Sequence, residues 1–204
     1  GGDTTFSKKL TFTITSVGFS DNIVFRNKAK LNDDIYVTGD LGDSFVGLKV
    51  LQNKISLNNV LSKYFKRKYY HPNLCINLTK KLLSFANTSI DISDGLFADL
   101  DKLINKQKLT YKIYLKKIPI SKSLNRLINL KILKKISTIS SGDDYQILFT
   151  APSSKSRIIS KTSKSLGIKI SKIGKICNNR EKSQIIDEKN KKIAIKSKGY
   201  FHTF

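Results

Sequence analysis

One stretch of the sequence, residues 34–48, reads DIYVTGDLGDSFVGL. Its first five residues have the apolar and β-branched character of a strand, and a turn containing Gly39 and Gly42 follows at once. Ser44 can then begin a helix whose apolar face continues to Leu51. A strand, a glycine turn and a helix N-terminus in succession can receive an anion, although many α/β proteins make such turns for packing.

A second strand–turn–helix stretch lies at residues 89–104, where IDISDGL is its central part. Asp91 and Asp94 flank the junction, and Ser93 lies between them with backbone N–H groups that can bind a phosphate oxygen while the carboxylates hold Mg²⁺. Asp94 can also be a simple helix cap, since Asp is favoured there in any protein. Asp91 is harder to explain in this way, because a carboxylate that ends an apolar strand is costly without a partner.

The remaining pattern alternates strands and helices, which predicts an α/β or α+β fold with helices on one side of a mixed sheet. Further strands are expected at residues 10–15, 109–115, 145–150, 168–176, 184–186 and 192–195, and further helices at residues 58–68, 121–137 and 153–166. Leu74, Leu78, Leu82 and Phe85 form one helical stripe, which we interpret as core.

The acidic residues concentrate in glycine-flanked turns, although the chain has 38 Lys and Arg against 15 Asp and Glu. Carboxylates beside glycine turns are well placed to reach a hard cation or to orient a phosphate. Asp143 and Asp144 are adjacent like charges, which destabilise each other unless a cation or a donor is near; the alternative is an ordinary polar turn. Asp40 and Asp43 are interpreted as structural residues of the turn and of the helix that follows.

The net charge of +23 admits two interpretations. One is a nucleic-acid-binding surface, and the other is a compositional bias toward Lys, Ile and Asn. Only five basic residues are Arg, the side chain that base recognition favours, and the Lys residues are spread along the chain. We therefore expect no dedicated nucleic-acid partner, although a basic surface also attracts phosphorylated metabolites.

Several absences limit the class of protein. Cys75 and Cys177 match no metal-ligand spacing and are expected to be reduced and structural. No apolar run approaches the roughly 20 residues of a membrane span and no signal peptide is evident, so a cytoplasmic protein is expected. The chain contains no Met, which predicts that it is a piece of a longer protein.

Taken in order, the motifs resemble those of the thiamine-monophosphate kinases, members of the AIR-synthase-related superfamily. The matching stretches are Gly1–Thr5, Arg26–Lys30, Asp34–Gly39, Gly42–Ser44, Gly47–Leu48, Ile90–Leu96, Gly142–Tyr145 and Gly199–Tyr200. They span nearly the whole chain. Within the superfamily, the IDISDGL and GDDY elements are more similar to these kinases than to the purine-pathway or selenophosphate members.

The resemblance implies ATP-dependent phosphoryl transfer to thiamine monophosphate, giving thiamine diphosphate, with Mg²⁺. The residues it assigns to ATP are Gly2, Asp3, Arg26 and Ser93; those it assigns to Mg²⁺ are Asp3, Asp91 and Asp94; those it assigns to the thiamine substrate are Asp143 and Tyr200. It names no catalytic base. An enzyme of the same superfamily that acts on another acceptor and a basic nucleic-acid-binding module are the alternatives.

The resemblance also implies a domain division. Residues 1–27 would be the end of an amino-terminal ATP-binding domain together with a linker strand, and residues 28–204 an AIR-synthase-related carboxy-terminal domain. The missing amino-terminal domain would form a homodimer interface, and this chain alone would be inactive. Two departures stand out: the family usually has Glu where Asp143 stands, and an Arg-rich proline motif appears here as His71–Cys75 without its Arg residues.

Overall fold

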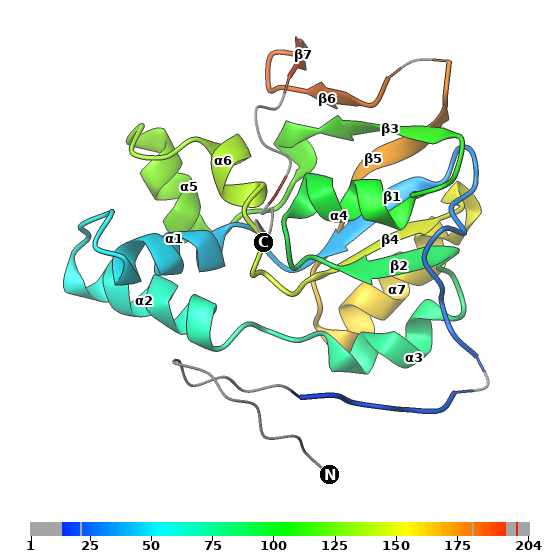
Figure 1. Cartoon of the computed structure of the whole chain (residues 1–204), viewed down its shortest axis with the longest axis horizontal. Helices are drawn as coiled ribbons and strands as arrows, with labels where there is room; N and C mark the ends of the chain where they lie inside the picture. Colours follow the sequence, from blue (N-terminus) through cyan, green and yellow to red (C-terminus); the bar gives the residue numbers. More distant parts are fainter. Residues whose placement is uncertain (1–13, 21, 181, 195–198, 200–204) are drawn as a thin grey trace, which may run out of the picture.

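The computed structural model describes residues 14–20, 22–180, 182–194 and 199 (Figure 1). Along the chain the elements are β1 (Asp34–Thr38), α1 (Asp43–Leu51), α2 (Asn59–Tyr70), η1 (Ile76–Leu78), α3 (Thr79–Leu82), β2 (Thr88–Asp91), α4 (Leu96–Leu103), β3 (Leu109–Tyr114), η2 (Leu115–Lys117), α5 (Lys122–Asn129), α6 (Lys135–Ile139), β4 (Ile147–Ala151), η3 (Ser153–Lys155), α7 (Ser156–Leu166), β5 (Ile170–Asn178), β6 (Gln184–Ile186) and β7 (Lys192–Ile193).

The described strands form one sheet in the order β2-β4-β1-β5-β3-β6-β7. The β3–β6 pair is parallel, and the other strand pairs are antiparallel. The mixed sheet expected from the sequence is therefore confirmed. β1 lies near its centre, with Asp34 opposite Ala151 of β4 on one side and Lys175 of β5 on the other.

Helices cover both faces of this sheet, so the expected one-sided arrangement is wrong. Ile35 and Val37 of β1 pack into a core with α4, which crosses the front of the sheet in Figure 1. Tyr36, which points to the opposite face, packs into a second core with residues of α3 and α7. All residues of β1 are buried, and a strand buried on both faces needs a layer on each side.

A third core joins α1, α2 and α5 beside the sheet. Its fully buried members include Val46, Phe65 and Leu124. The side chain of Asn58 accepts a hydrogen bond from the Leu61 N–H at the start of α2, as expected for a helix cap. Because α1 and α2 pack against each other here, the turn that precedes α1 is held on a rigid support.

The continuous helix expected at residues 121–137 is wrong, because the chain divides it into α5 and α6. Lys131 lies between them in the left-handed region, with φ of 57°. Leu127 of α5 packs into the helical core, whereas Ile139 of α6 packs into the core against α4. One straight helix could not reach both cores, so the chain turns between them.

The apolar stripe expected as core is only partly helical. Leu78, Leu82 and Phe85 are buried as predicted, but Leu74 is 59% exposed and precedes η1. Of the strand expected at residues 10–15, only residues 14 and 15 are described, and they lie in no strand.

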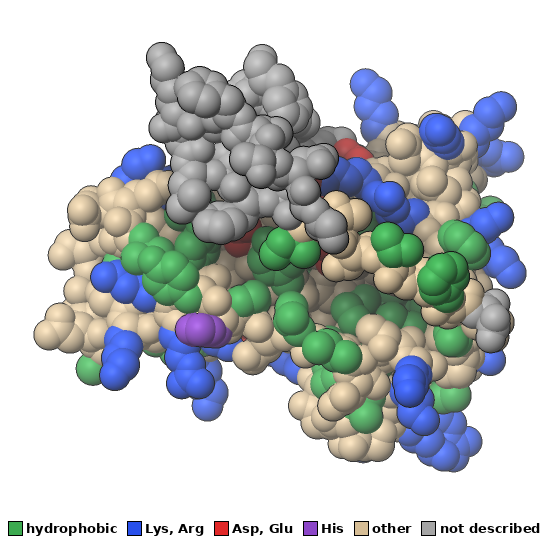
Figure 2. Space-filling model, turned by 60° about the horizontal axis from the view of Figure 1, so that its bottom comes forward, with side chains coloured by type: hydrophobic (Ala, Val, Ile, Leu, Met, Phe, Trp, Pro, Cys, Tyr) green, Lys and Arg blue, Asp and Glu red, His purple; other side chains and the backbone are tan. Residues whose placement is uncertain are grey.

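The described surface is rich in apolar side chains. Figure 2 shows hydrophobic groups gathered across one face, with Lys and Arg mainly toward its margins. Phe19, Phe25, Leu74, Ile76 and Leu83 are among the large apolar residues that are at least 49% exposed. None of the helices in the described part of the chain has the length and apolar character needed to cross a membrane.

Candidate active site

The turn between β2 and α4 carries the carboxylates that the sequence placed near Mg²⁺. Asp91 ends β2 with an exposed side chain, and Asp94 lies in the turn, partly buried. Gly95 has φ of 119°, a conformation that suits glycine, and its position against the Ser140 carbonyl leaves no room for a side chain. The chain can therefore reverse sharply before α4 begins at Leu96.

The loop before β4 packs directly against this turn. The N–H of Asp143 donates to the Ser93 carbonyl at 2.9 Å, and the N–H of Tyr145 donates to the Ile92 carbonyl at 2.9 Å. A Cβ atom on Gly142 would lie 2.1 Å from the Ser93 oxygen, so the loop can approach this closely only with glycine there. Two motifs that are far apart in the sequence are thus joined into one site.

The joined loops bring acidic side chains into mutual electrostatic range. Burial raises the pKa of Asp143, and the neighbouring charge of Asp94 raises it further. Burial also raises the pKa of the Tyr145 hydroxyl, with added contributions from Asp143 and Asp91. Asp143 and Tyr145 both have positive φ, 59° and 50°, a strained geometry that clusters at functional sites.

The backbone N–H groups of this turn are already paired, contrary to expectation. The Asp99 carboxylate, which is fully buried, accepts from the N–H groups of Ser93, Asp94 and Gly95 at 2.9, 2.9 and 3.1 Å. The sequence predicted that these amides bind a phosphate oxygen, but an internal carboxylate takes that place. A nucleotide could meet Ser93 through its hydroxyl but not through its amide.

Lys102 of α4 reaches back to the same turn. Its ammonium group pairs with Asp94 and, at 2.9 Å, with Asp99. The charge of Asp94 is therefore partly neutralised from within the chain. Asp91, on the other side of the turn, pairs with Ile147 in the β2–β4 ladder, and its side chain is exposed.

The carboxylates alone do not form a complete metal site. Within the described residues, no three Asp, Glu, His or Cys side chains converge closely enough to hold an ion. Mg²⁺, however, is usually held by one or two protein carboxylates together with phosphate oxygens and water. Asp91 and Asp94 fit that partial role.

The first glycine turn, before α1, is also closed by an internal carboxylate. Asp144 is buried and accepts from the Gly42 N–H with both oxygens, at 3.0 and 2.9 Å. Burial raises the pKa of Asp144 to about 8, and the adjacent Asp43 raises it while the Gly42 bond lowers it. The anion site predicted at residues 39–44 is therefore filled by the protein itself.

Asp43 has the structural role that the sequence suggested. Its two oxygens accept from the Ser121 and Tyr64 hydroxyls, each at 2.7 Å, which ties α1 to α2 and to the start of α5. Burial raises its pKa, and these two hydrogen bonds oppose that change. Asp40 pairs with Lys169 at 2.5 Å on the surface.

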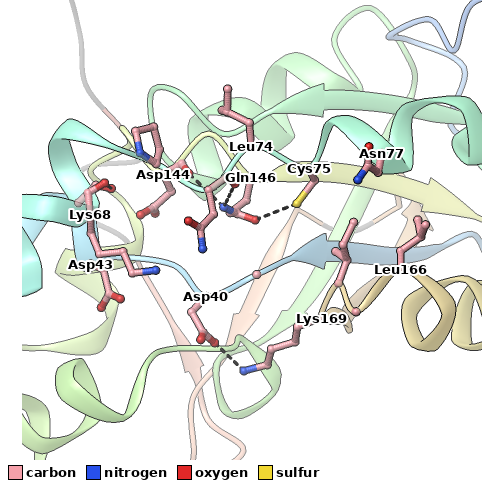
Figure 3. Close-up of a pocket in the computed structure, with 16 residues that line it drawn as sticks. Asp40, Asp43, Lys68, Leu74, Cys75, Asn77, Asp144, Gln146, Leu166 and Lys169 are labelled. Atoms are coloured by element: carbon pink, nitrogen blue, oxygen red, sulfur yellow. Dashed lines mark hydrogen bonds and ion pairs between the residues drawn. The ribbon is translucent and has the colours of Figure 1, made fainter.

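A cavity of about 370 Å³ lies between the glycine turn that precedes α1, residues 72–77 and residues 166–169 (Figure 3). Gln146 lines it and is held by bonds from its amide to the Asn73 carbonyl and from the Cys75 thiol to its oxygen. Asp91, Asp94 and Asp143 do not line this cavity. We therefore place the candidate chemistry at the β2–α4 turn and not in this cavity.

The other predicted site residues lie elsewhere or outside the described chain. Arg26 is exposed near the opposite end of β2 and α4, since its neighbour Asn27 donates to the carbonyl of Leu103. Gly2, Asp3 and Tyr200 lie outside the described residues. Gly199 is described, and its backbone lies against Asp94 and Ala98.

Sequence reasoning missed two residues of the site, Asp99 and Lys102. The available signal was their spacing, because an acid in the first turn of a helix can reach back to the preceding amides, and Lys three residues later lies on the same face. It also missed that Asp144, not Asp43, holds the first glycine turn.

No protein-family model matches the chain. A thiamine-monophosphate kinase of Buchnera aphidicola from Schizaphis graminum is 37% identical over 206 residues, covering 99% of this chain and 62% of the relative. The thiamine-monophosphate kinase of Escherichia coli K12 is 31% identical over 205 residues, with the same coverage. The chain thus spans about three fifths of the length of these curated relatives.

Among solved structures, too, the chain is similar to thiamine-monophosphate kinases. The thiamine-monophosphate kinase of Stenotrophomonas maltophilia K279a matches 81% of this chain and 52% of its own, with a TM-score of 0.71 and 25% identity. The AaThiL complex with AMPPCP and TMP matches 87% of this chain and 54% of its own, with a TM-score of 0.70 and 27% identity. Escherichia coli HypE, at 14% identity and a TM-score of 0.65, shares the fold.

Proposed function

We propose that the chain, which is similar over 99% of its length to thiamine-monophosphate kinases, belongs to their family and supplies part of an ATP-dependent phosphotransferase. The reaction would convert thiamine monophosphate to thiamine diphosphate. The relatives are longer than this chain, so we propose the activity for the protein that contains it.

The observation that carries the proposal is the joining of the β2–α4 turn to the loop before β4. It gathers Asp91, Asp94 and Asp143 at one edge of the sheet, although three α-helices and a strand lie between Asp94 and Asp143 in the sequence. Such a concentration of charge in a strongly basic chain suits a cation and its phosphates better than it suits packing.

We assign Asp91 and Asp94 to Mg²⁺, with the remaining ligands from phosphate, water and Asp3. Mg²⁺ bound there would neutralise charge on the phosphates. Lys102 already contacts Asp94, so a metal ion bound there would have to share this carboxylate with the Lys102 ammonium or displace it. Ser93, through its hydroxyl, Gly2 and Asp3 are assigned to ATP, and Asp143 and Tyr200 to the thiamine substrate. Arg26, which lies at the opposite end of β2 and α4, is assigned to ATP on the family resemblance alone.

The chemistry needs little beyond positioning. An oxygen of the substrate phosphate attacks the γ-phosphorus of ATP, the bond to the β-phosphate oxygen breaks, and ADP leaves. The attacking oxygen is already ionised, so no catalytic base is assigned. Holding the two phosphates in line and balancing their charge is the main contribution of a protein to such a transfer.

The wider assignments rest on the same family relationship. We propose residues 1–27 as the end of an amino-terminal domain and residues 28–204 as the carboxy-terminal domain. We also propose a cytoplasmic homodimer for the complete protein, assembled through the amino-terminal domain. The exposed apolar residues on the face in Figure 2 are consistent with contacts made by a further part of the protein.

The test is thiamine diphosphate formation from ATP, Mg²⁺ and thiamine monophosphate, for this chain alone and for the chain extended by its upstream coding sequence. We expect turnover in the extended protein and its loss in Asp91→Asn, because the metal would lose a ligand. Asp101→Asn is the matched control, since Asp101 accepts from the Tyr111 hydroxyl away from the turn. No turnover in a folded, extended protein would refute the kinase assignment.

A panel of other phosphate acceptors separates the kinase from a related enzyme of the same fold. On the face shown in Figure 2, Lys and Arg lie mainly at the margins and not in one stripe, so this face does not favour the nucleic-acid module.

A further inference from the structure

We propose that Asp99 is a positioning residue that fixes the β2–α4 turn and orients Asp94 for a divalent cation. The proposal rests on the proposed function, because it assumes that Asp91 and Asp94 bind the metal. Asp99 itself is fully buried and cannot contact nucleotide or metal directly.

The first support is the hydrogen-bond pattern. One oxygen of Asp99, Oδ2, accepts from three consecutive N–H groups, those of Ser93, Asp94 and Gly95, at 2.9–3.1 Å. A helix cap serves the amides of the first helical turn. Here α4 begins at Leu96, and all three amides precede it, so the carboxylate organises the turn that carries the metal ligands.

The second support is the route through Lys102. The other oxygen of Asp99, Oδ1, binds the Lys102 ammonium at 2.9 Å, and the same ammonium contacts the Asp94 carboxylate. Asp99 therefore constrains Asp94 in two ways. It accepts a hydrogen bond from the Asp94 backbone N–H, and it holds the Lys102 ammonium that contacts the Asp94 side chain. In this chain Lys102 supplies the positive charge beside Asp94.

A consequence concerns the phosphates. Because Asp99 occupies the three amides from inside, an incoming phosphate cannot bind them, although a helix N-terminus after a glycine turn is a common phosphate site. The nucleotide must then be attracted by the cation and by side chains. The turn presents carboxylates to a metal instead of presenting amides to an anion.

The test measures Mn²⁺ affinity by electron paramagnetic resonance on the purified chain, with Asp99→Asn, Asp101→Asn and Asp91→Asn. Asp99→Asn keeps the shape of the side chain but replaces one acceptor oxygen with a donor. We expect its Kd for Mn²⁺ to rise about 10–100-fold, the usual effect of removing a residue that orients a metal ligand. Asp101→Asn, two residues along the same helix, should leave the Kd unchanged.

Amide hydrogen exchange of Ser93–Gly95 gives a second readout, since those amides should lose protection in Asp99→Asn. All affinities are measured where unfolding curves show a fully folded protein. Asp99→Ser replaces Asp99→Asn if that variant does not fold; its shorter side chain leaves its oxygen farther from the three amides and from Lys102, so a rise in Kd of at least the same size is expected.

The outcomes separate this proposal from the function on which it rests. Mn²⁺ binding that is lost in Asp91→Asn but unchanged in Asp99→Asn refutes the positioning role and leaves the metal site intact. Lower stability in Asp99→Asn with unchanged Kd assigns Asp99 to folding alone. Wild-type binding that is absent, or unaffected by Asp91→Asn, refutes the metal site and therefore both proposals.

Discussion

Replacing Asp144 with Asn should change how the stability of the protein depends on pH. Asp144 is 4% exposed, and burial raises its pKa from 3.8 to about 8. Between these values the folded protein binds the proton and the unfolded chain does not. Stability is therefore greatest below the unfolded pKa and falls as the pH rises toward 8. Asn cannot titrate, and its amide oxygen can still accept from the Gly42 N–H.

The size of the effect follows from linkage. A difference of one pH unit in this range changes the free energy of unfolding by about 1.4 kcal/mol for one proton. From about pH 5 to pH 8 the wild type should lose about 4 kcal/mol relative to Asp144→Asn. That loss is a large part of the roughly 5–15 kcal/mol that stabilises a typical domain.

Urea unfolding followed by circular dichroism at about pH 5 and about pH 8.5 measures the effect. The quantity compared is the stability of the variant minus that of the wild type at each pH, so that groups unaffected by the substitution cancel. We expect this difference to shift in favour of Asp144→Asn at the higher pH. An equal difference at both pH values would show that Asp144 does not titrate in this range and would refute the reasoning.

Two further substitutions test the supports of the two glycine turns. Tyr64→Phe removes the hydroxyl that donates to Asp43 at 2.7 Å. Because a buried carboxylate oxygen then loses its donor, the free energy of unfolding measured in urea should fall by about 1–3 kcal/mol. No loss of stability would show that water replaces the hydroxyl. Gly142→Ala places a methyl group 2.1 Å from the Ser93 oxygen. Its loss of stability should clearly exceed the roughly 1 kcal/mol expected for the control Gly167→Ala. At Gly167 φ is also positive, but nothing lies within 4 Å of the added methyl group. Equal costs for the two glycine variants would contradict the close packing of the loops.

The elements near the carboxylates were predictable because their signals are local. A buried strand followed by an Asp-containing glycine turn and a helix was recognisable at β2–α4 and at β1–α1. The partner of each turn was missed, although the spacing of Asp99 in its helix carried a signal and only Asp144 had none. The carboxylates that fill them, Asp99 and Asp144, lie 4 and 102 residues from the glycines whose amides they bind, Gly95 and Gly42.

The wrong predictions have a common physical cause. Periodicity alone treats residues 121–137 as one helix, but Leu127 and Ile139 belong to different cores. Likewise, strand alternation does not state which faces are covered, and Tyr36 with its stacked partner Phe149 required helices on the second face. In both cases long-range packing determined the result.

The central position of β1 has a consequence for the order of folding during synthesis. Its neighbours are β4 and β5, and Asp33 beside it accepts from Thr150, 117 residues later in the chain. At a translation rate of about 5–20 residues per second, this strand waits roughly 6–23 seconds for its first neighbour. During that time the helical pair α1–α2 can form from local contacts, while the middle of the sheet is completed only once β4 and β5 have been synthesised.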